Sequence, residues 1–307
     1  MLQTAQGPTQ LRALLAQEGL LTAPGVYDGL SAKIAEAAGV AVLYVSGGAI
    51  ARSMGYPDIG LVTLTEMQKR LEEIRAVTAL PLIVDADTGY GNALNVIRTI
   101  RAYARSGAAA LHIEDQVEPK RCGHYEGKQV VASAEMVQKI QAAAEACGDS
   151  GLVVIARTDA RAVLGLDAAI ERGNAYAEAG ADMIFVEAPQ SVEEIQRIAL
   201  EVKAPLVINM FWGGKTPLVP AERLAALGYR IMIVPSDLQR AAIRAMQRAA
   251  AEIRTHGHTA AMAEDMVSFA EREELIDLAE AQALQHRFLK GQDEERTPPP
   301  QKRRNVF

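Results

Sequence analysis

Short apolar runs that recur at even spacing constrain the fold of this chain more than any other feature. Each run has four to six residues, and each but the last is clearly followed by a segment of helical composition. Near-continuous apolar strands that alternate with helices are typical of a parallel sheet buried on both faces. The eight expected strands cover residues 24–27, 40–45, 81–85, 108–113, 152–157, 183–187, 205–209 and 231–234.

Eight strand–helix units within about 230 residues favour an α/β fold of the closed (β/α)8 TIM-barrel type. The hydrophobic content of 49% in 307 residues is ample for such a core. An open doubly wound sheet is the alternative, but no Gly-x-Gly-x-x-Gly follows the first strand, which weakens a dinucleotide-binding interpretation. The expected helices cover residues 9–18, 31–38, 65–77, 93–105, 133–146, 167–178, 191–202 and 220–226.

The chain divides into three parts by composition. Residues 1–237 form the predicted catalytic barrel, and residues 238–290 add more helix than a barrel needs to close. These extra helices either pack on the barrel wall or pack on another subunit. Residues 291–307 contain Pro298-Pro299-Pro300 and are predicted to be a flexible tail.

Charge and cysteine content narrow the function class. The formal net charge of −6 and the lack of a basic stripe in the body of the chain argue against nucleic acid or an anionic membrane as the main partner. Two cysteines do not make a disulfide framework, and neither a signal peptide nor an 18-residue apolar span is evident. We therefore expect a cytoplasmic protein.

Polar residues stand at or beside the carboxyl end of most expected strands. In a barrel these ends share one face, where the chemistry of TIM-barrel enzymes is located. The residues at these ends are Tyr27, Ser46, Gly47, Gly48, Asp85, Asp87, Glu114, Arg157, Glu187 and Asn209.

Three of these residues form an all-oxygen anionic set. Asp85 and Asp87 are two positions apart, so both side chains leave the same face of an extended segment, and Glu114 follows the next strand. Such a cluster in a cavity needs a cation, and magnesium or manganese fits carboxylate ligands best. The alternative is that Asp87 caps a helix and Asp85 forms a buried ion pair.

The loop after the fourth strand carries a thiol among cations. Cys122 lies close to Lys120, Arg121 and His124, and neighbouring cations stabilise a thiolate that can take or deliver a proton. Zinc is not expected, because Cys147, predicted to be structural, is the only other cysteine. The alternative is an idle thiol in an exposed loop.

Two further groups could bind an anionic ligand. The backbone N–H groups of Ser46-Gly47-Gly48 could hold a carboxylate or phosphate, and a simple tight turn is the alternative. Arg157 could clamp a carboxylate through two hydrogen bonds, or pair with Glu187 instead. His112 lies within a strand and is predicted to be a core histidine.

Together these motifs resemble the isocitrate lyase/phosphoenolpyruvate mutase superfamily. The resemblance covers roughly residues 10–255, and its most specific part, Lys-Arg-Cys-Gly-His, is similar to the lyase branch that includes 2-methylisocitrate lyase and 2,3-dimethylmalate lyase. The motifs are Tyr44-Val45-Ser46-Gly47-Gly48, Asp85-Ala86-Asp87-Thr88-Gly89-Tyr90-Gly91, Glu114-Asp115-Gln116 and Lys120-Arg121-Cys122-Gly123-His124.

The resemblance implies roles for individual residues. It implies Mg²⁺ held by Asp85, Asp87 and Glu114 with Asp58 nearby, and a gating loop whose Cys122 protonates the departing carbanion. It also implies a C-terminal helix swapped between subunits of a homotetramer, a dimer of dimers. The residues then expected to bind the substrate, a small carboxylate, or to assist catalysis are Tyr44, Ser46, Gly47, Gly48, Lys120, Gly123, His124, Arg157, Glu187, Asn209 and Trp212.

The predicted activity is Mg²⁺-dependent carbon–carbon cleavage of a 2-hydroxy di- or tricarboxylate into a 2-keto acid, such as pyruvate, and a second carboxylate. Trp212 and Tyr125 stand where relatives carry Glu and Arg, which favours a 2-alkylmalate over a tricarboxylate. The alternatives are an oxaloacetate hydrolase or decarboxylase and, from another class, a non-catalytic carboxylate-binding barrel.

Overall fold

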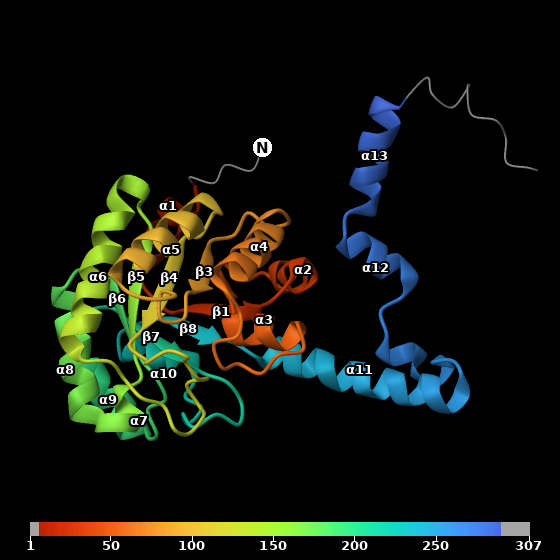
Figure 1. The fold of residues 1–307 in the computed structure, drawn as a ribbon. Coiled ribbons are helices and arrows are strands. Elements are labelled where there is room, and N and C mark those ends of the chain that lie inside the picture. The colour runs from red at the N-terminus through yellow and green to blue at the C-terminus, as the bar shows by residue number, and fades with distance from the viewer. Residues whose placement is uncertain (1–5, 290–307) are drawn as a thin grey trace, which may run out of the picture. The chain divides into compact units, whose positions relative to one another are not determined.

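The computed structural model describes residues 6–289, and within them eight parallel strands close into a barrel surrounded by helices (Figure 1). Each strand pairs with the next along the chain, and the last pairs with the first. The predicted (β/α)8 fold is confirmed. The strands are β1 (Leu21–Val26), β2 (Leu43–Val45), β3 (Leu82–Asp85), β4 (Ala110–Glu114), β5 (Val153–Thr158), β6 (Met183–Val186), β7 (Leu206–Asn209) and β8 (Tyr229–Val234).

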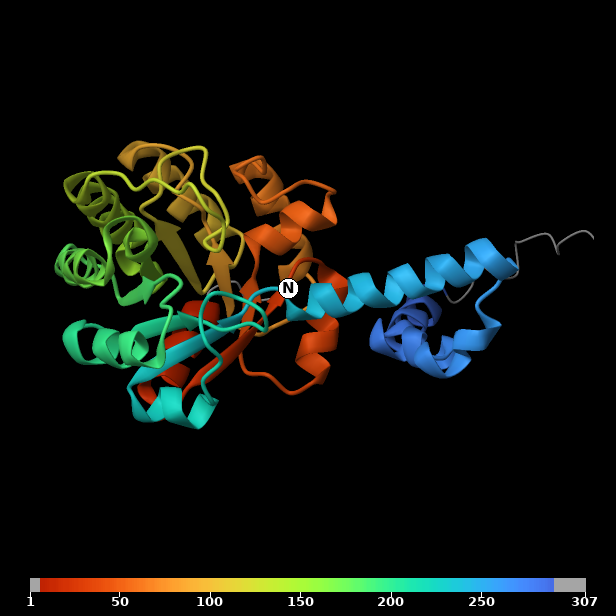
Figure 2. The same cartoon turned by 90° about the horizontal axis from the view of Figure 1, so that it is seen from below.

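The helices lie outside the ring of strands in both views of the barrel (Figure 2). They are α1 (Gln6–Ala16), α2 (Gly29–Ala37), α3 (Gly47–Ser53), α4 (Leu64–Arg75), α5 (Ala93–Arg105), α6 (Ser133–Cys147), α7 (Ala160–Leu164), α8 (Leu166–Glu178), α9 (Val192–Glu201) and α10 (Ala221–Ala226), with a 3-10 turn, η1, at Gly148–Ser150. The expected helix at residues 93–105 has the predicted bounds. Helices α3 and α7 were not predicted, because each is a short segment directly after a strand.

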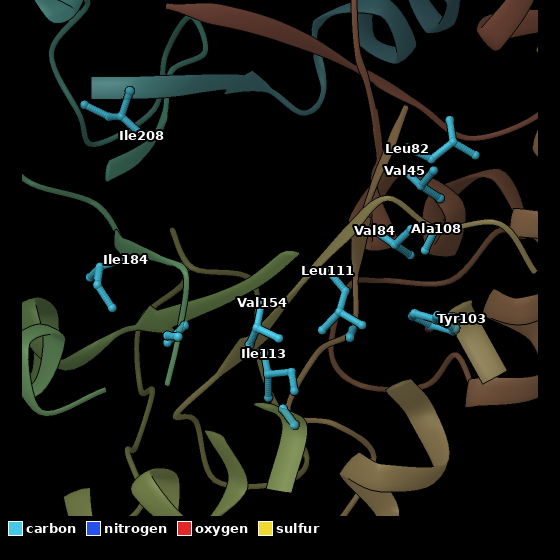
Figure 3. Packing of buried hydrophobic residues seen from close by; sticks show 14 of the residues in the cluster. Val45, Leu82, Val84, Tyr103, Ala108, Leu111, Ile113, Val154, Ile184 and Ile208 are labelled. Carbon is cyan, nitrogen blue, oxygen red and sulfur yellow. The ribbon is translucent and has the colours of Figure 1, made fainter. Parts of the chain in front are cut away.

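Two apolar clusters fill the barrel and its shell. Side chains such as Leu82, Val84 and Leu111 point outward and pack under the helices (Figure 3). Ile83, Ile155 and Phe185 belong to the second cluster, which fills the barrel interior. Successive side chains of a strand point to opposite faces, so the two clusters alternate along each strand.

This alternation decides which polar residues enter the site. Asp85 follows the interior residue Ile83 by two positions, Arg157 follows Ile155, and Glu187 follows Phe185. Each is therefore in phase with the barrel interior at the carboxyl end of its strand. The period of two that builds the core also directs the polar side chains inward.

The amino end of the barrel is closed by helix α1. Leu11 is fully buried in the interior cluster, and Arg12 donates hydrogen bonds to the carbonyl of Gly151 and to Asp182. Arg230 in β8 donates to the carbonyl of Leu15. Because this end is plugged, an interior cavity can open only at the carboxyl ends of the strands.

The chain divides into two compact units between Ala250 and Ala251, inside helix α11 (Asp237–His256). The second unit contains the 3-10 segment η2 (Ala260–Asp265), α12 (Phe269–Leu275) and α13 (Leu278–Phe288). The predicted tail at 291–307 lies outside the described residues, and helix swapping stays a prediction. None of the helices in the described part of the chain is long and apolar enough to cross a membrane.

Candidate active site

A cavity of about 380 Å³ opens at the carboxyl ends of the strands. Most of the predicted site residues line it, and they come from six strands or the loops that follow them. Its lining includes Tyr44, Ser46, Gly48, Asp58, Asp85, Lys120, Cys122, Gly123, His124, Arg157, Glu187 and Asn209. Helix α11 and the segment before it add Pro235, Gln239, Arg240 and Ile243.

Arg157 is the central cation of this cavity. Its Nη1 lies 3.2 Å from Glu114, and its Nε lies 3.0 Å from Asp159 and 3.7 Å from Glu187. Burial alone would lower the pKa of Arg157, but the three carboxylates, Asp159 foremost, raise it well above its usual value. Arg157 therefore stays charged. It lines the cavity and at the same time pairs with Glu187, so the two alternatives drawn from the sequence do not exclude each other.

Lys120 lies between two of the predicted metal ligands. Its Nζ is 2.5 Å from Asp58 Oδ1 and 2.8 Å from Asp87 Oδ1. Asp85 instead accepts a hydrogen bond from the Tyr44 hydroxyl at 3.3 Å. Asp87 does not line the main cavity but a neighbouring one of about 500 Å³ on the other side of Lys120. In this arrangement, no three His, Cys, Asp or Glu side chains among residues 6–289 converge on a metal position.

The electrostatics of the acidic cluster nevertheless fit a hard cation. Burial raises the pKa of Asp87 to about 6 and that of Glu114 well above its usual value, although Lys120 and Arg157 respectively oppose the shift. Glu114 Oε1 is buried without a hydrogen-bond partner. The negative charge of the four carboxylates around Lys120 is only partly balanced by this lysine. Their oxygen atoms are the kind of ligand that Mg²⁺ prefers. The donor set fits a divalent cation.

Ser46-Gly47-Gly48 begins helix α3 and is not a simple tight turn. Ser46 caps the helix through its side chain, which accepts from the N–H of Ala49 at 3.2 Å. A Cβ at Gly47 would lie 2.7 Å from Asp85 Oδ2, and one at Gly48 would lie 2.6 Å from Asp58 Oδ2. Glycine is required at both positions because the carboxylates approach the backbone so closely.

The loop that carries Cys122 is docked against the cavity. The N–H of Cys122 donates to the carbonyl of Asp58 at 3.1 Å, and Gln116 bonds both the N–H and the carbonyl of Arg121. Burial and the charge of Asp58 raise the pKa of the Cys122 thiol. The expectation that neighbouring cations stabilise a thiolate was wrong, because burial and Asp58 outweigh the opposing effect of Arg52 on the pKa. A protonated thiol is the form that acts as an acid.

His124 pairs with Glu187 in the wall of the cavity. The N–H of Lys215 donates to His124 Nδ1 at 3.1 Å, so in the neutral ring the proton is on Nε2, which lies 3.0 Å from Glu187 Oε1. Asn209 donates to the same Glu187 oxygen at 3.3 Å. Although burial opposes ionisation, Arg157 and His124 lower the pKa of Glu187 to about 2.

Three residues singled out in the sequence do not belong to the cavity lining. Trp212 is 69% exposed, does not belong to the cavity lining, and packs on the Arg240 guanidinium at 5.6 Å. His112 is a core histidine as predicted: its Nε2 is 2.8 Å from the Tyr44 hydroxyl, and burial lowers its pKa to about 4. Tyr27 is half-buried and outside the lining.

Among the polar residues of the lining, sequence reasoning missed Arg52, Gln239 and Arg240 as parts of the site. Arg52 is near the end of the short helix α3, and Arg240 is in the first turns of the long helix α11. No local pattern distinguishes them from ordinary surface arginines. Because these two cations line the cavity, the sequence-based preference for a 2-alkylmalate over a tricarboxylate loses its support.

Comparison with known proteins gives consistent matches. The family model described as phosphoenolpyruvate phosphomutase matches residues 11–254. The 2,3-dimethylmalate lyase of Eubacterium barkeri is 41% identical over 92% of this chain and 98% of that protein. The 2-methylisocitrate lyase of Halalkalibacterium halodurans is 44% identical over 92% of this chain and 93% of that protein.

Solved structures agree in fold over the same length. A 2,3-dimethylmalate lyase, described as a PEP mutase/isocitrate lyase superfamily member, matches with a TM-score of 0.87 at 36% identity over 95% of this chain and 98% of that one. An oxaloacetate acetylhydrolase matches with a TM-score of 0.87 at 35% identity, over 92% and 97%. A phosphonopyruvate hydrolase in complex with oxalate and Mg²⁺ matches with a TM-score of 0.83 at 33% identity, over 93% and 99%.

Proposed function

The chain belongs to the PEP mutase/isocitrate lyase superfamily and is a carbon–carbon lyase, and we propose that it cleaves a 2-hydroxy di- or tricarboxylate of the 2-alkylmalate or 2-methylisocitrate type. The products are a 2-keto acid, such as pyruvate, and a second carboxylate. The observation that carries the proposal is the half-buried Cys122 thiol held on the wall of a cavity that also presents Arg157 and Tyr44.

The proposed cofactor is Mg²⁺, with Mn²⁺ as a substitute. Asp85, Asp87, Glu114 and Asp58 would hold it, since their buried oxygens are compensated only in part by Lys120. When bound, the ion would polarise the 2-oxygen and the carboxylate of the substrate. The solved phosphonopyruvate hydrolase complex with oxalate and Mg²⁺ supports this assignment by analogy.

The protein's own residues account for the other requirements of the cleavage. As the hydroxyl gives its proton to a carboxylate of the cavity wall and the C2–C3 bond breaks, the bonding electrons pass to the departing fragment as an enolate. Arg157, which its carboxylate neighbours keep charged, offers a fixed positive charge to this developing anion. Cys122 then gives its proton to the enolate carbon, and the raised pKa of the thiol keeps that proton in place beforehand.

At the keto-acid end, Tyr44 is fixed between Asp85 and His112, so its hydroxyl has a defined position in the wall. The first turn of helix α3 presents the backbone N–H groups of Gly47 and Gly48, and we propose that they bind the substrate carboxylate. Gly123, His124 and Asn209 complete the binding wall, and Trp212 adds to it only if the segment after β7 moves.

The test is Mg²⁺-dependent keto-acid release from 2-methylisocitrate, isocitrate, 2,3-dimethylmalate, citramalate and oxaloacetate. We expect turnover of one lyase substrate, loss of activity with EDTA, and a fall of about 10²- to 10⁴-fold in kcat for Cys122→Ser. Cys147→Ser is the matched control, because that thiol lies outside the cavity lining. Turnover of oxaloacetate alone, with oxalate and acetate as products, would indicate the hydrolase instead. Unchanged substrate throughout would indicate a binding protein.

We also propose a homo-oligomer, a dimer of dimers with a swapped C-terminal helix, and a cytoplasmic location. The long helix α11 and the helices α12 and α13 support the first part, since apolar side chains such as Phe269 and Phe288 are 72% exposed in the single chain. Two free cysteines support the second. Sedimentation of the purified protein tests the assembly.

A further inference from the structure

Lys128 buries its ammonium group at the end of the loop that carries Cys122. The side chain is 2% exposed, and the carboxylate of Asp159 beside it is fully buried. Nζ donates to Asp159 Oδ1 at 2.7 Å and to the carbonyl of Gly123 at 2.5 Å. Burying an ion pair is costly, and the desolvation often cancels the attraction. This pair therefore calls for an explanation other than stability.

The carbonyl that Lys128 holds belongs to the peptide unit that also contacts the thiol. The unit consists of the Gly123 carbonyl and the His124 N–H, and the His124 backbone lowers the pKa of the Cys122 thiol against the larger effects of burial and Asp58. A trans peptide is planar, with C=O and N–H pointing in opposite directions. Fixing the carbonyl on Lys128 therefore fixes the direction of the N–H toward the sulfur.

Asp159 links this unit to the central cation of the cavity. Its Oδ1 accepts from Lys128 and, at 3.1 Å, from Arg157 Nη2, and its Oδ2 accepts from Arg157 Nε at 3.0 Å. Its own N–H donates to Asp115 Oδ1 at 2.8 Å. Asp115 is held in turn by side chains of strand β5 and helix α8, namely Thr158, Arg172 and Tyr176. The anchor of Lys128 is thus part of the rigid barrel.

Gly123 also packs directly on Arg157, which Asp159 orients, and on Glu187. A Cβ built there would lie 2.4 Å from Arg157 Nη2 and 2.6 Å from Glu187 Oε1. The peptide is therefore held from two sides, by close packing on Arg157 and by the bond from Lys128 to its carbonyl.

We propose that Lys128 is a positioning residue: paired with Asp159, it fixes the Gly123–His124 peptide and so couples the placement of Cys122 to that of Arg157. The role rests on the proposed function only in taking Cys122 as the acid. Without Lys128 the loop keeps its other bonds at Gln116 and Asp58 but loses the one that sets the plane of the peptide next to the thiol.

The first test measures loop order without substrate, using Lys128→Met and, as a matched control, Lys215→Met. Lys215 also pairs with an acidic side chain of the loop, Glu126, but at the exposed surface. In Lys128→Met we expect hydrogen exchange in residues 117–131 and alkylation of Cys122 to rise about tenfold or more, the size expected for loss of one hydrogen bond from a charged donor. Exchange in helix α6 and alkylation of Cys147 should not change.

If hydrogen exchange rose throughout the barrel and alkylation of Cys122 rose no more than that of Cys147, the pair would be merely structural and the proposal would be overturned. Wild-type rates of exchange and alkylation in Lys128→Met would also overturn it. If Lys128→Met does not fold, Lys128→Gln replaces it, since its amide keeps a donor but is too short and uncharged to bridge both acceptors.

The second test is kinetic and depends on the lyase activity. Because misplacement of a reacting group by about 1 Å can cost about 10²-fold in rate, we expect kcat of Lys128→Met to fall by that order while KM changes less than about threefold. An unchanged kcat with a disordered loop would overturn the coupling. A wild-type protein without lyase activity would refute the proposed function, whereas the exchange and alkylation tests of Lys128 would still apply.

Discussion

Replacing Gly123 by alanine should displace the loop that carries Cys122. The added Cβ would lie 2.4 Å from Arg157 Nη2 and 2.6 Å from Glu187 Oε1, whereas ordinary contact begins at 3.4 Å. The backbone must therefore retreat by about 3.4 − 2.4 = 1.0 Å. Arg157 and Glu187 cannot yield instead, because both are buried and held by ion pairs on other sides.

A shift of about 1 Å in a catalytic group costs about 10²-fold in rate, which corresponds to about 2.7 kcal/mol on the barrier. We therefore expect kcat of Gly123→Ala to fall about 10²-fold in the keto-acid release assay. The control is Gly29→Ala at the start of helix α2, where the new Cβ would meet Val77 Cγ2 at 3.4 Å, an ordinary contact. A Gly123→Ala enzyme with kcat within about threefold of wild type would refute the docked-loop reasoning.

Three further predictions concern buried charge and thiol chemistry. Asp115→Ala leaves the Arg172 guanidinium without its carboxylate partner, so urea unfolding should show a loss of about 3–5 kcal/mol in the free energy of unfolding. Arg157 and His124 lower the pKa of Glu187 from 4.5 to about 2 against the effect of burial, so its stabilising contribution is present above pH 4.5 and is lost as pH falls toward 2. Unfolding of Glu187→Gln should accordingly depend less on pH in that window, and an equal dependence would contradict the assignment. Burial raises the pKa of Cys147 to about 11, so its iodoacetamide alkylation, followed by mass spectrometry, should rise about tenfold per pH unit from 8 to 10; a plateau near pH 9 would contradict this.

The strand positions were predictable because burial on both faces leaves a clear mark in the sequence. The runs at 81–85 and 205–209 contain β3 and β7, and Asp85 and Asn209 end these strands as expected. The first strand is less apolar, and β1 begins at Leu21, three residues before the predicted start. Hydrogen bonding to β8 stabilises this strand although its own sequence pattern is weak. Pairing between segments so far apart in the chain cannot be detected from the residues of the strand alone.

Which candidates share one cavity was also predictable, since the carboxyl ends of parallel strands meet at one edge. How they pair was not. Lys120 bridges Asp58 and Asp87 across 62 and 33 positions of the chain, and the sequence suggested only that it lay near Cys122. The direction of the Cys122 pKa shift was mispredicted because burial of the thiol and the charge of Asp58, a residue distant in the sequence, outweigh the neighbouring cations.

The sequence by itself determined the barrel, the inward phase of Asp85, Arg157 and Glu187, and the identity of the thiol loop, because apolar periodicity and strand ends are local properties. Only the tertiary structure decided that Lys128 and Asp159 form a buried pair behind the loop, and that Arg52 and Arg240 enter the cavity while Trp212 does not. Ion pairing depends on distances between side chains from separate elements. Those distances exist only once the barrel has closed.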